Sequence, residues 1–495
     1  MPCRLEVILV GSARVLSAIS GKIRSVIQLR DVQLPALALE LGERFIAAGF
    51  ELALVGGPVR DLFLGRAAPD LDFTTNATPD QILDVVRGWA EATWDVGREF
   101  GTIALRKRGE DIEITTYRAD VYDAGSRKPH VRFGEKLEDD LARRDFTVNA
   151  MALRLPAGEL VDPFGGRADV EAGVLRTPSG PEISFSDDPL RMMRGARFVS
   201  QLGFELAGPE RSAMQQMAAR LEIVSAERVR DELNKLMLGS DPALGLHVMV
   251  TTGLADYVLP ELPALQMATD ANHHHKDVYQ HSLTVLRQAI EHEGTSAGDA
   301  VPGPDLVLRL AALLHDIGKP ATRRFENGAV SFRNHEVVGA KMARKRLRAL
   351  RYDNATIKAV VRLVELHMRF YGYADVAWSD SAVRRYVNDA GDVLSRLHLL
   401  TRSDVTTQNR RKAERLEHAY DDLERRIEEL AEQEALDAIR PDLNGQQIME
   451  ILDIKPGPVV GRAYKFLLER RLDRGPVSEE QAKQELLEWW AEQDA

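Results

Sequence analysis

The stretch "LVGGPVRDLFLGRAAPDLDF", residues 54–73, runs from a buried-type strand through two glycines and a short helix into a second strand. Gly56-Gly57 leave backbone N–H groups free to approach an anion, and Arg60 adds a cation on the following turn. Asp70 and Asp72 occupy positions i and i+2 of a strand, so both carboxylates point to one face. They repel each other unless a cation lies beside them, and Mg²⁺ often joins carboxylates to phosphates. The stretch therefore predicts a triphosphate cradle beside a magnesium site.

The composition describes an ordinary globular chain and limits its partners. Its 495 residues, 44% hydrophobic and 28% charged, suffice for several domains with their own cores. No run of about 18 apolar residues occurs, so no membrane span is expected. The single cysteine, Cys3, excludes internal disulfides and favours a reducing cytoplasm. Because the net charge is −11, a nucleic-acid surface must be a local basic patch.

Strand-like and helical segments alternate in the first third of the chain, which predicts an α+β unit with a mixed sheet. Helices are expected at 34–48 and 79–92. The strand-like runs are "FELALVGG", "DLDFTT", "GTIALRKRG", "DIEITTYR" and "FTVNAMALRLP". Beyond Asp187 nearly every segment is typical of a helix, with breaks at 239–242 and 294–304 and a long charged helix at 410–439.

A third carboxylate is expected on the strand "DIEITTYR". Asp111, Glu113 and Thr115 share one face of this strand by period-two alternation. Glu113 is the first candidate to join the aspartate pair, and Asp111 is the alternative. A salt-bridged sheet edge explains the same pattern nearly as well.

Two further motifs place cations near this site. "RRDFTVNAM" and "DDPLRMMRGARF" combine arginines with aspartates and apolar packing residues. The arginines of the second motif are spaced three residues apart, so on a helix they lie along one face that rotates gradually about the axis. The residues concerned are Arg143, Arg144, Asp145, Asp188, Arg191, Arg194 and Arg197.

Together these motifs resemble those of class II tRNA nucleotidyltransferases, the CCA-adding enzymes, and the related bacterial poly(A) polymerases. The resemblance spans about residues 34–238. It implies that Asp70 and Asp72 hold catalytic Mg²⁺ and that an RNA 3′-hydroxyl attacks the α-phosphate of a nucleotide while pyrophosphate leaves. It also implies a nucleotide-binding set of Gly57, Arg60, Arg144, Asp188, Arg191, Arg194 and Arg197.

The pairing edges of the bases make a nucleotide-selecting helix chemically reasonable. Cytosine and adenine each present an amine donor beside a ring-nitrogen acceptor, which a carboxylate and a guanidinium can satisfy. Asp188 and Arg191 lie one turn apart and could offer this pair together. Guanine and uracil reverse the order, and each unsatisfied buried group costs about 1–3 kcal/mol. The expected partners are therefore CTP, ATP and the tRNA 3′ end.

The choice among family activities depends on two other segments. The stretch 116–145 resembles the family's flexible loop, which enzymes that add only the two cytidines partly lack, so complete CCA addition is expected. Poly(A) polymerase is the alternative, but the C-terminus "EEQAKQELLEWWAEQDA" is acidic rather than strongly basic.

A second set of side chains has the composition of a metal centre. Imidazoles and carboxylates together suit Mg²⁺ or a transition metal such as Mn²⁺ or Ni²⁺. The stretch 276–412 resembles an HD-type phosphohydrolase domain, which implies a metal-dependent phosphatase or cyclic phosphodiesterase, or a mainly structural body. A chain that is principally a phosphohydrolase is the third reading. The implied ligands are His281, His315, Asp316, His335, His367 and Asp404. The run His273-His274-His275 lies outside this signature.

Basic patches at 341–346 and 410–412 are candidates to hold RNA phosphates. The sequence makes no prediction of the oligomeric state. The expected organisation is a disordered extension at 1–31, a nucleotidyltransferase head at 32–175, a helical neck and RNA-binding region at 176–270, an HD domain at 271–412 and a helical tail at 413–495.

Overall fold

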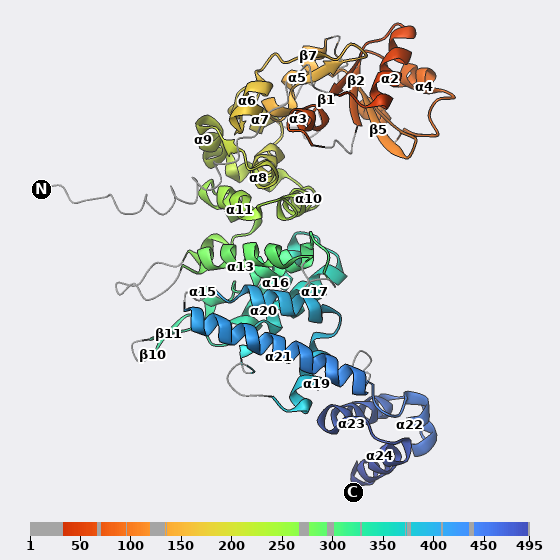
Figure 1. Ribbon diagram of the computed structural model, residues 1–495, viewed down its shortest axis with the longest axis vertical. Helices are drawn as coiled ribbons and strands as arrows, with labels where there is room; N and C mark the ends of the chain where they lie inside the picture. Colours follow the sequence, from red (N-terminus) through yellow and green to blue (C-terminus); the bar gives the residue numbers. More distant parts are fainter. Residues whose placement is uncertain are drawn as a thin grey trace, which may run out of the picture. The chain divides into compact units, whose positions relative to one another are not determined.

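The computed structural model describes residues 33–66, 71–95, 97–118, 134, 136–266, 277–294, 301–326, 329–371, 373, 378–406, 409–434 and 440–493. The extension expected at 1–31 and most of the loop expected within 116–145 lie outside these residues. The chain divides into two compact units (Figure 1), Met1–Val224 with Leu244–Tyr257 and Ser225–Ala243 with Val258–Ala495. Among the described helices, none has the length and apolar character that a membrane span requires.

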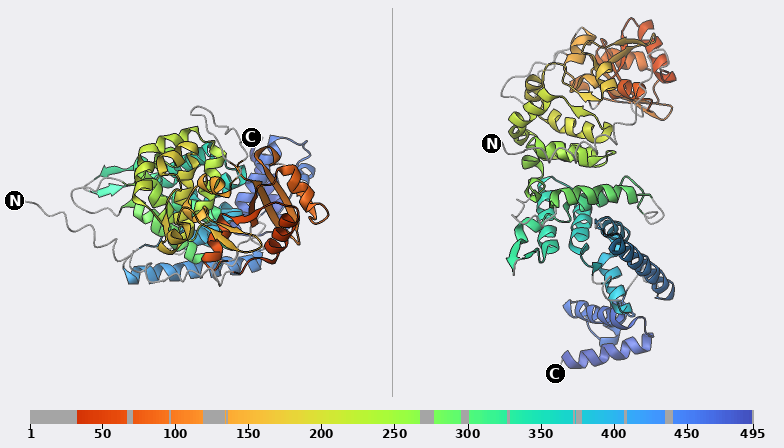
Figure 2. Two further views of the ribbon diagram at one scale, coloured as in Figure 1. Left: turned by 90° about the horizontal axis from the view of Figure 1, so that it is seen from above. Right: turned by 60° about the vertical axis from the view of Figure 1, so that its left-hand side comes forward.

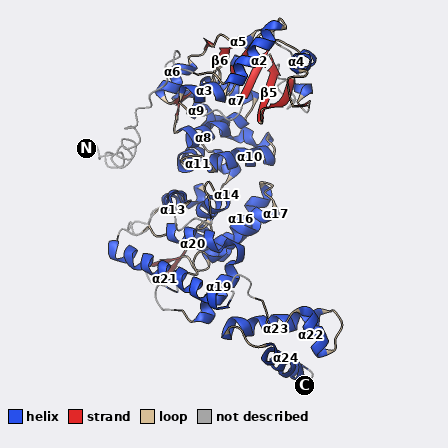
Figure 3. Ribbon diagram, turned by 45° about the vertical axis from the view of Figure 1, so that its right-hand side comes forward, coloured by secondary structure: helices blue, strands red, loops and turns tan. Residues whose placement is uncertain are grey.

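A seven-stranded mixed sheet forms the core of the first unit (Figure 3), in the order β3-β4-β5-β2-β1-β6-β7. Strands β2 and β5 pair in parallel, and their other neighbours pair antiparallel. The strands are β1 (Leu52–Val55), β2 (Leu71–Thr75), β3 (Ala92–Trp94), β4 (Thr102–Lys107), β5 (Glu110–Thr116), β6 (Ala152–Arg154) and β7 (Glu159–Val161). The mixed sheet predicted from the sequence is confirmed.

Helices that pack on this sheet begin and end where the sequence supplies caps. α2 (Ala36–Ala47) buries Leu37, Leu41 and Phe45 at helical spacing and contacts β1. α3 (Gly57–Phe63) follows β1 directly. α4 (Pro79–Val86) opens with a capping box between Thr78 and Gln81 and ends well before the predicted residue 92, because Gly88 adopts a φ of 69°.

The segment "FTVNAMALRLP" is not one strand as predicted. Thr147–Asn149 form a 3₁₀ turn, and the strand β6 starts only at Ala152. The buried Asp145 carboxylate accepts from the Phe146 N–H and from Asn149 Nδ2, at 2.8 and 3.0 Å. These bonds from a side chain to its neighbours compete with strand pairing and curl the chain.

The rest of the first unit is helical, as expected beyond residue 187, apart from a two-residue parallel pair of β8 (Val174–Leu175) and β9 (Glu205–Leu206). α8 carries the arginine motif and buries most of its length, including Met192, Met193 and Phe198. The helices are α5 (Leu137–Ala142), α6 (Gly166–Ala172), α7 (Pro181–Asp187), α8 (Leu190–Leu202), α9 (Gly208–Met217), α11 (Pro242–Thr251) and α12 (Leu254–Val258).

The second unit is helical except for a hairpin of β10 (Arg324–Glu326) and β11 (Ala329–Ser331), which the sequence pattern did not predict. α13, α14, α17 and α20 pack on one another, and α16 packs on α17. The helices are α10 (Ala226–Met237), α13 (Val278–His292), α14 (Leu306–Leu314), α15 (Lys319–Thr322), α16 (His335–Ala349), α17 (Asn354–Leu366), α19 (Asp380–Ala390), α20 (Leu394–Ser403), α21 (Arg410–Glu434), α22 (Gly445–Leu452), α23 (Pro458–Arg474) and α24 (Glu479–Gln493).

The long helix predicted at 410–439 is α21, a continuous helix of 25 residues (Figure 2). Residues 435–439 lie outside the described part of the chain. α22, α23 and α24 have a hydrophobic cluster of their own, centred on the buried Ile448, Leu467 and Leu486. The tail therefore has a separate small core.

Candidate active site and candidate metal centre

The predicted carboxylates of the sheet meet at adjacent strands. Asp72, half-buried, is the register partner of Glu113 in the parallel pair β2–β5, so the two side chains lie opposite each other on one face. Leu54 pairs with Phe73 in the antiparallel pair β1–β2, which places Asp72 beside the end of β1, next to Gly56. Asp70 lies outside the described residues.

The alternative third carboxylate, Asp111, has a different environment. Its oxygens accept from Arg106 Nε and Nη2 at 2.6 and 2.9 Å, and both side chains are exposed. The hydrogen bonds from Arg106 lower the pKa of Asp111. Asp111 thus forms a salt bridge, as in the competing reading, but with its register partner Arg106 on β4 and on an interior strand rather than at a sheet edge, while Glu113 is the neighbour of Asp72.

The glycine turn and Arg144 pack against each other. Gly56 has a φ of 75°, and a Cβ built on it would lie 2.9 Å from Arg144 Nη1. The backbone conformation favours glycine, and a side chain here would displace the Arg144 guanidinium from its place against the turn. On its other side, Arg144 Nη2 lies 3.2 Å from Oδ2 of the fully buried Asp140. Burial would raise the pKa of Asp140, but Arg144 and Arg143 hold it below its ordinary value.

A chain of polar contacts joins the α3 arginine to the arginine helix. Arg60 donates to both carboxylate oxygens of Asp61, each at 3.0 Å, and to Asn149 Oδ1 at 2.7 Å. Asn149 donates to Asp145, which forms an ion pair with Arg194 at 2.7 Å. Burial would raise the pKa of Asp145, but the Arg194 cation and the hydrogen bonds keep it low. The three predicted motifs therefore form one network.

The candidate selecting helix α8 has fixed arginines. Arg191 is buried and donates to Ser184 Oγ at 2.9 Å and to the Arg143 carbonyl oxygen at 2.5 Å. Asp188 Oδ1 accepts from the Leu190 N–H at 3.1 Å. The Arg197 guanidinium lies 4.3 Å from the centre of the Phe198 ring. Arg191 and Arg197 are thus built into the wall of the first unit rather than exposed as a solvated stripe.

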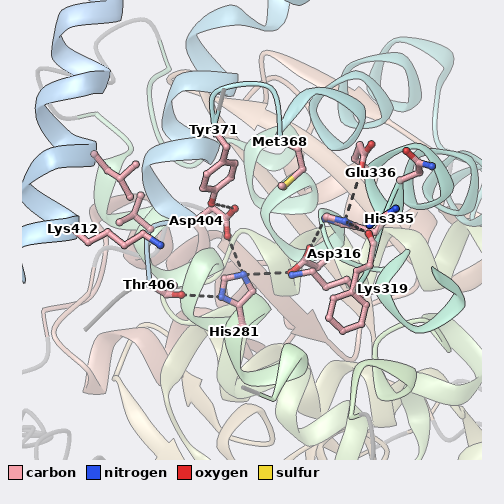
Figure 4. Close-up of a pocket in the computed structure, with 15 residues that line it drawn as sticks. His281, Asp316, Lys319, His335, Glu336, Met368, Tyr371, Asp404, Thr406 and Lys412 are labelled. Atoms are coloured by element: carbon pink, nitrogen blue, oxygen red, sulfur yellow. Dashed lines mark hydrogen bonds and ion pairs between the residues drawn. The ribbon is translucent and has the colours of Figure 1, made fainter. Parts of the chain in front are cut away.

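The six predicted metal ligands of the second unit converge at helix ends. His281 lies on α13, and His335 opens α16. His315, His367 and Asp404 are the C-cap residues of α14, α17 and α20, and Asp316 follows His315. They form two groups with ligand atoms within 4.8 Å of one another: His281, His315 and Asp404, and Asp316, His335 and His367. Figure 4 shows four of these residues, His281, Asp316, His335 and Asp404, in the wall of a cavity.

Asp316 faces both groups. Its Oδ2 lies 3.4 Å from His281 Nε2 and 3.2 Å from His315 Nε2. Its Oδ1 lies 3.2 Å from His335 Nε2. Asp404 Oδ1 lies 2.9 Å from His281 Nε2. A carboxylate with one oxygen toward each group is suited to bridge two cations.

The histidines present Nε2 to the centre because Nδ1 is engaged elsewhere. Nδ1 of His315, His335 and His367 lies 2.9, 2.9 and 2.7 Å from the carbonyl oxygen three residues earlier, and Nδ1 of His281 lies 3.1 Å from Thr406 Oγ1. A carbonyl only accepts, so Nδ1 carries the proton and Nε2 the lone pair. Nε2 atoms of His335 and His367 are 3.2 Å apart. Two Nε2 lone pairs that face each other repel unless a cation or a proton lies between them. This arrangement of imidazole donors therefore fits a metal ion.

The electrostatics of the centre favour a positive charge. Burial would lower the pKa of His315, but Asp316 and Asp404 raise it to about 10. Burial and the neighbouring His315 lower the pKa of His367 to about 4. Burial would raise the pKa of Asp404, but hydrogen bonds from His281 and His315 hold it far below its ordinary value. The two ionised carboxylates hold a proton on His315, and a divalent cation bound to these donors would take the place of that positive charge.

The remaining predicted sites have mixed outcomes. His273-His274-His275 lie outside the described residues. In the patch 341–346, Arg346 pairs with Glu261 at 2.9 Å, and in the patch 410–412, Arg410 pairs with Glu414 at 2.8 Å. Lys341, Arg344, Lys345, Arg411 and Lys412 remain on the surface.

Sequence reasoning missed several side chains of both sites. Asp140 stands four residues before Arg144 in "EDDLARRD", a helical spacing that could have revealed the pair. Asn149 lies within a recognised motif, but its role as a link between Arg60 and Asp145 depends on the turn. Tyr371, whose hydroxyl donates to Asp404 at 2.8 Å, had no sequence signal.

Comparisons with known proteins agree with this arrangement of domains. Family models match the "Poly A polymerase head domain" at residues 52–176, the "Probable RNA and SrmB- binding site of polymerase A" at 203–265 and the "HD domain" at 278–407. The first unit thus contains a nucleotidyltransferase head, and the second contains an HD domain.

Similar proteins extend this result to the whole chain. The A-adding tRNA nucleotidyltransferase of Deinococcus radiodurans is 35% identical over 455 residues, covering 89% of this chain and 96% of that relative. The CCA-adding enzyme of Geobacillus thermodenitrificans is 42% identical over 211 residues, about half of that relative. The crystal structure of the Bacillus stearothermophilus CCA-adding enzyme in complex with CTP is 25% identical, with a TM-score of 0.65, over 92% of this chain and 98% of that one. The chain belongs to the tRNA nucleotidyltransferase family.

Proposed function

We propose that this enzyme adds the terminal CCA of tRNA, or repairs it, by transferring nucleotides from CTP and ATP to the RNA 3′ end. The observation that carries the proposal is the contact network of the first unit, which joins Arg60 after the glycine turn to Arg194 on α8 through Asn149 and Asp145. The names of the relatives, A-adding and CCA-adding, support the same substrate. A tRNA substrate and a single cysteine fit a cytoplasmic location.

In this proposal Asp72 holds Mg²⁺ together with Asp70, and Glu113 is the third carboxylate. Bound Mg²⁺ would supply Lewis-acid stabilisation of the attacking hydroxyl and the leaving pyrophosphate oxygens. The Asp72 and Glu113 carboxylates are register partners on one sheet face, which suits a shared cation.

The triphosphate is proposed to lie along the turn at Gly57, with Arg60 and Arg144 as its cations. Asp140 orients the Arg144 guanidinium, while Asp61 and Asn149 fix that of Arg60. These contacts fix the orientations of both guanidinium groups before the substrate binds. Less side-chain entropy is therefore lost on binding.

The base is proposed to meet Asp188, at the end of α7, and Arg191 on α8, with Arg194 and Arg197 of the same helix completing the nucleotide-binding set. Because Arg191 is anchored to Ser184 and to the Arg143 carbonyl, its orientation is fixed from two sides. Discrimination against guanine and uracil then arises from unsatisfied buried groups.

A tRNA extension assay tests the activity. Purified full-length protein with Mg²⁺ receives transcripts ending before CCA, or ending in CC, with labelled CTP and ATP given separately and together. Complete CCA addition predicts two C from CTP alone and one A when ATP follows.

Addition of A alone is the second candidate, because the relative that matches almost the full chain is an A-adding enzyme. It predicts that only the transcript ending in CC is extended. Long A tracts without use of CTP would instead identify a poly(A) polymerase.

We also propose that the HD centre hydrolyses phosphoesters with Mn²⁺, Ni²⁺ or Mg²⁺ bound. The observation that supports this second activity is the pair of ligand groups bridged by Asp316. Metal analysis of the purified protein, followed by hydrolysis of phosphomonoesters and 2′,3′-cyclic nucleotides, tests it. Absence of bound metal and of hydrolysis after reconstitution would leave the domain a structural body.

A further inference from the structure

Four of the six HD ligands, His281, Asp316, His335 and Asp404, line a cavity of about 680 Å³. This volume falls within the range of small-molecule sites of nucleotide size, about 300–1,000 Å³. Around the metal-ligand groups the wall has an apolar part, which includes Met368 and Leu416, and an aromatic part with Phe332 and Tyr371. The cavity therefore has room for more than a free phosphate ion.

Three cations also line the cavity, and they differ in their partners. Lys319 Nζ lies 2.5 Å from Asp316 Oδ2, so it is tied to the metal-ligand set. Arg333 lies near the start of α16. For Lys412, no acidic partner is found among the described side chains, and Figure 4 shows it on the Asp404 side of the cavity. The acidic lining residue Glu336 lies beside His335, on the opposite side.

The direction of Lys412 is set by helical spacing along α21. Leu416 and Tyr420, four and eight residues later, are both buried. The Tyr420 ring stacks on Phe370 with centroids 3.6 Å apart, and its hydroxyl donates to the Thr401 carbonyl oxygen at 2.8 Å. Lys412 continues this face by one turn toward the N-terminus, where it is exposed and, like Leu416, lines the cavity.

We propose that Lys412 binds the phosphoryl oxygens of the substrate of the HD centre, and that this substrate is a nucleotide phosphoester. A lysine that lines the same cavity as the ligands Asp316 and Asp404, with no acidic partner among the described side chains, can neutralise a polyanionic substrate that occupies the cavity. The sugar or base packs against Met368 and Leu416. The inference rests on the proposed hydrolase activity of this domain.

The reaction is ordinary hydrolysis, in which the water oxygen bonds to phosphorus and the ester P–O bond breaks. The leaving alcohol oxygen takes a proton, and the products are phosphate and a nucleoside. Lys412 remains protonated throughout and contacts only non-bridging oxygens, so it is expected to affect substrate affinity more than turnover.

The test compares Lys412→Met, which keeps the length of the side chain, with Lys358→Met as a matched control on the exposed face of α17. Full-length protein reconstituted with Mn²⁺ is analysed for metal content, for 3′-AMP hydrolysis, and for binding of labelled inorganic phosphate and 3′-AMP by equilibrium dialysis. Loss of one charge-assisted contact is expected to weaken binding and raise KM about tenfold or more in Lys412→Met, with kcat and metal content nearly unchanged.

Each result has a separate meaning. Unchanged phosphate affinity in Lys412→Met at normal metal content overturns the role of Lys412. Equal affinity of wild-type protein for phosphate and 3′-AMP overturns the nucleotide assignment. If the wild-type protein hydrolyses nothing, the proposed activity fails, yet a Lys412-dependent loss of phosphate binding still supports the anion site.

Discussion

Replacement of the buried Asp140 by Asn tests how the first unit positions its arginines. The Asp140 carboxylate accepts from Arg143 Nε and Nη2 at 3.0 and 2.8 Å and from Arg144 Nη2 at 3.2 Å. Asn has the same shape but no charge, and its NH₂ group cannot accept from either guanidinium. Bonds to a charged partner contribute about 1.5–3 kcal/mol each, but Arg143 and Arg144 are 26% and 21% exposed and regain water. The expected total loss is therefore about 2 kcal/mol.

Hydrogen exchange of the full-length protein measures this loss locally, because the chain has two units and a single melting temperature would mix them. Amides of α5 in Asp140→Asn should exchange about 30-fold faster at pH 7, which corresponds to 2 kcal/mol. Glu138→Gln is the control, since Glu138 lies on the same helix but pairs with Arg154 at the surface. Its effect should stay within about 0.5 kcal/mol.

The stability difference between wild type and Asp140→Asn should depend on pH in a direction that a packing defect would not reproduce. The folded pKa of Asp140 is lowered, so its contribution is present above the ordinary carboxylate pKa and is lost as the pH falls through the folded value. The difference between wild type and Asp140→Asn should be constant from about pH 8 to 5 and narrow below about pH 4.

The same substitution should impair nucleotide binding through Arg144. Without its buried partner, the Arg144 guanidinium must be ordered when the triphosphate binds, which costs about 1 kcal/mol of binding free energy. KM for ATP should therefore rise about fivefold, with a smaller change in kcat. Faster α5 exchange with an unchanged KM would refute the positioning role, and unchanged exchange would refute the stability argument.

Three further predictions concern the carboxylates and the HD centre. Glu113→Gln should reduce nucleotide incorporation at least tenfold in a single-turnover extension assay. Asp111→Asn should remain near wild type, because Asp111 is paired with Arg106 on the neighbouring strand β4. Equal losses in the two variants would contradict the choice of Glu113. Gly318→Ala would place a Cβ 2.1 Å from the carbonyl oxygen of the candidate ligand His335 and so displace it. Plasma emission spectroscopy should therefore find less bound metal in the variant. A metal content equal to that of the wild type would show that α16 can shift without loss of the site. Removal of metal by a chelator should speed hydrogen exchange of the α14 and α17 amides, and added Mn²⁺ should restore protection, since facing imidazole lone pairs are otherwise uncompensated. Exchange that is insensitive to metal would argue for protons in that role.

The sequence predicted the sheet and the order of the HD ligands because both depend on local patterns. Alternation in "DIEITTYR" and the glycines before Arg60 determine strands and turns over a few residues. The hairpin Arg324–Ser331 escaped prediction because its strands are only three residues long. The choice between Glu113 and Asp111 needed the register with β2, which no single strand contains.

The partition of the HD ligands into two groups could not be read from their order in the chain. His315 and Asp316 are consecutive, yet His315 belongs to the group of His281 and Asp316 to that of His335. Both residues follow the end of α14, and Asp316 places Oδ2 near His281 on α13 while its Oδ1 reaches His335 on α16. The spacing of the histidines and aspartates in the sequence identifies the metal donors. Which donors lie in the same group depends on where the packed helices end.

Asp145 gives the sharpest case of function hidden by a plausible local pattern. The β-branched and apolar residues that follow it predict a strand, yet its carboxylate curls the chain into the turn Thr147–Asn149. That turn brings Asn149 to Arg60, while the second oxygen of Asp145 meets Arg194. A residue that breaks the local rule therefore connects three motifs that are distant in sequence. The failure of strand prediction here is what a site residue should produce, because its side chain replaces backbone pairing in order to hold the arginines in place.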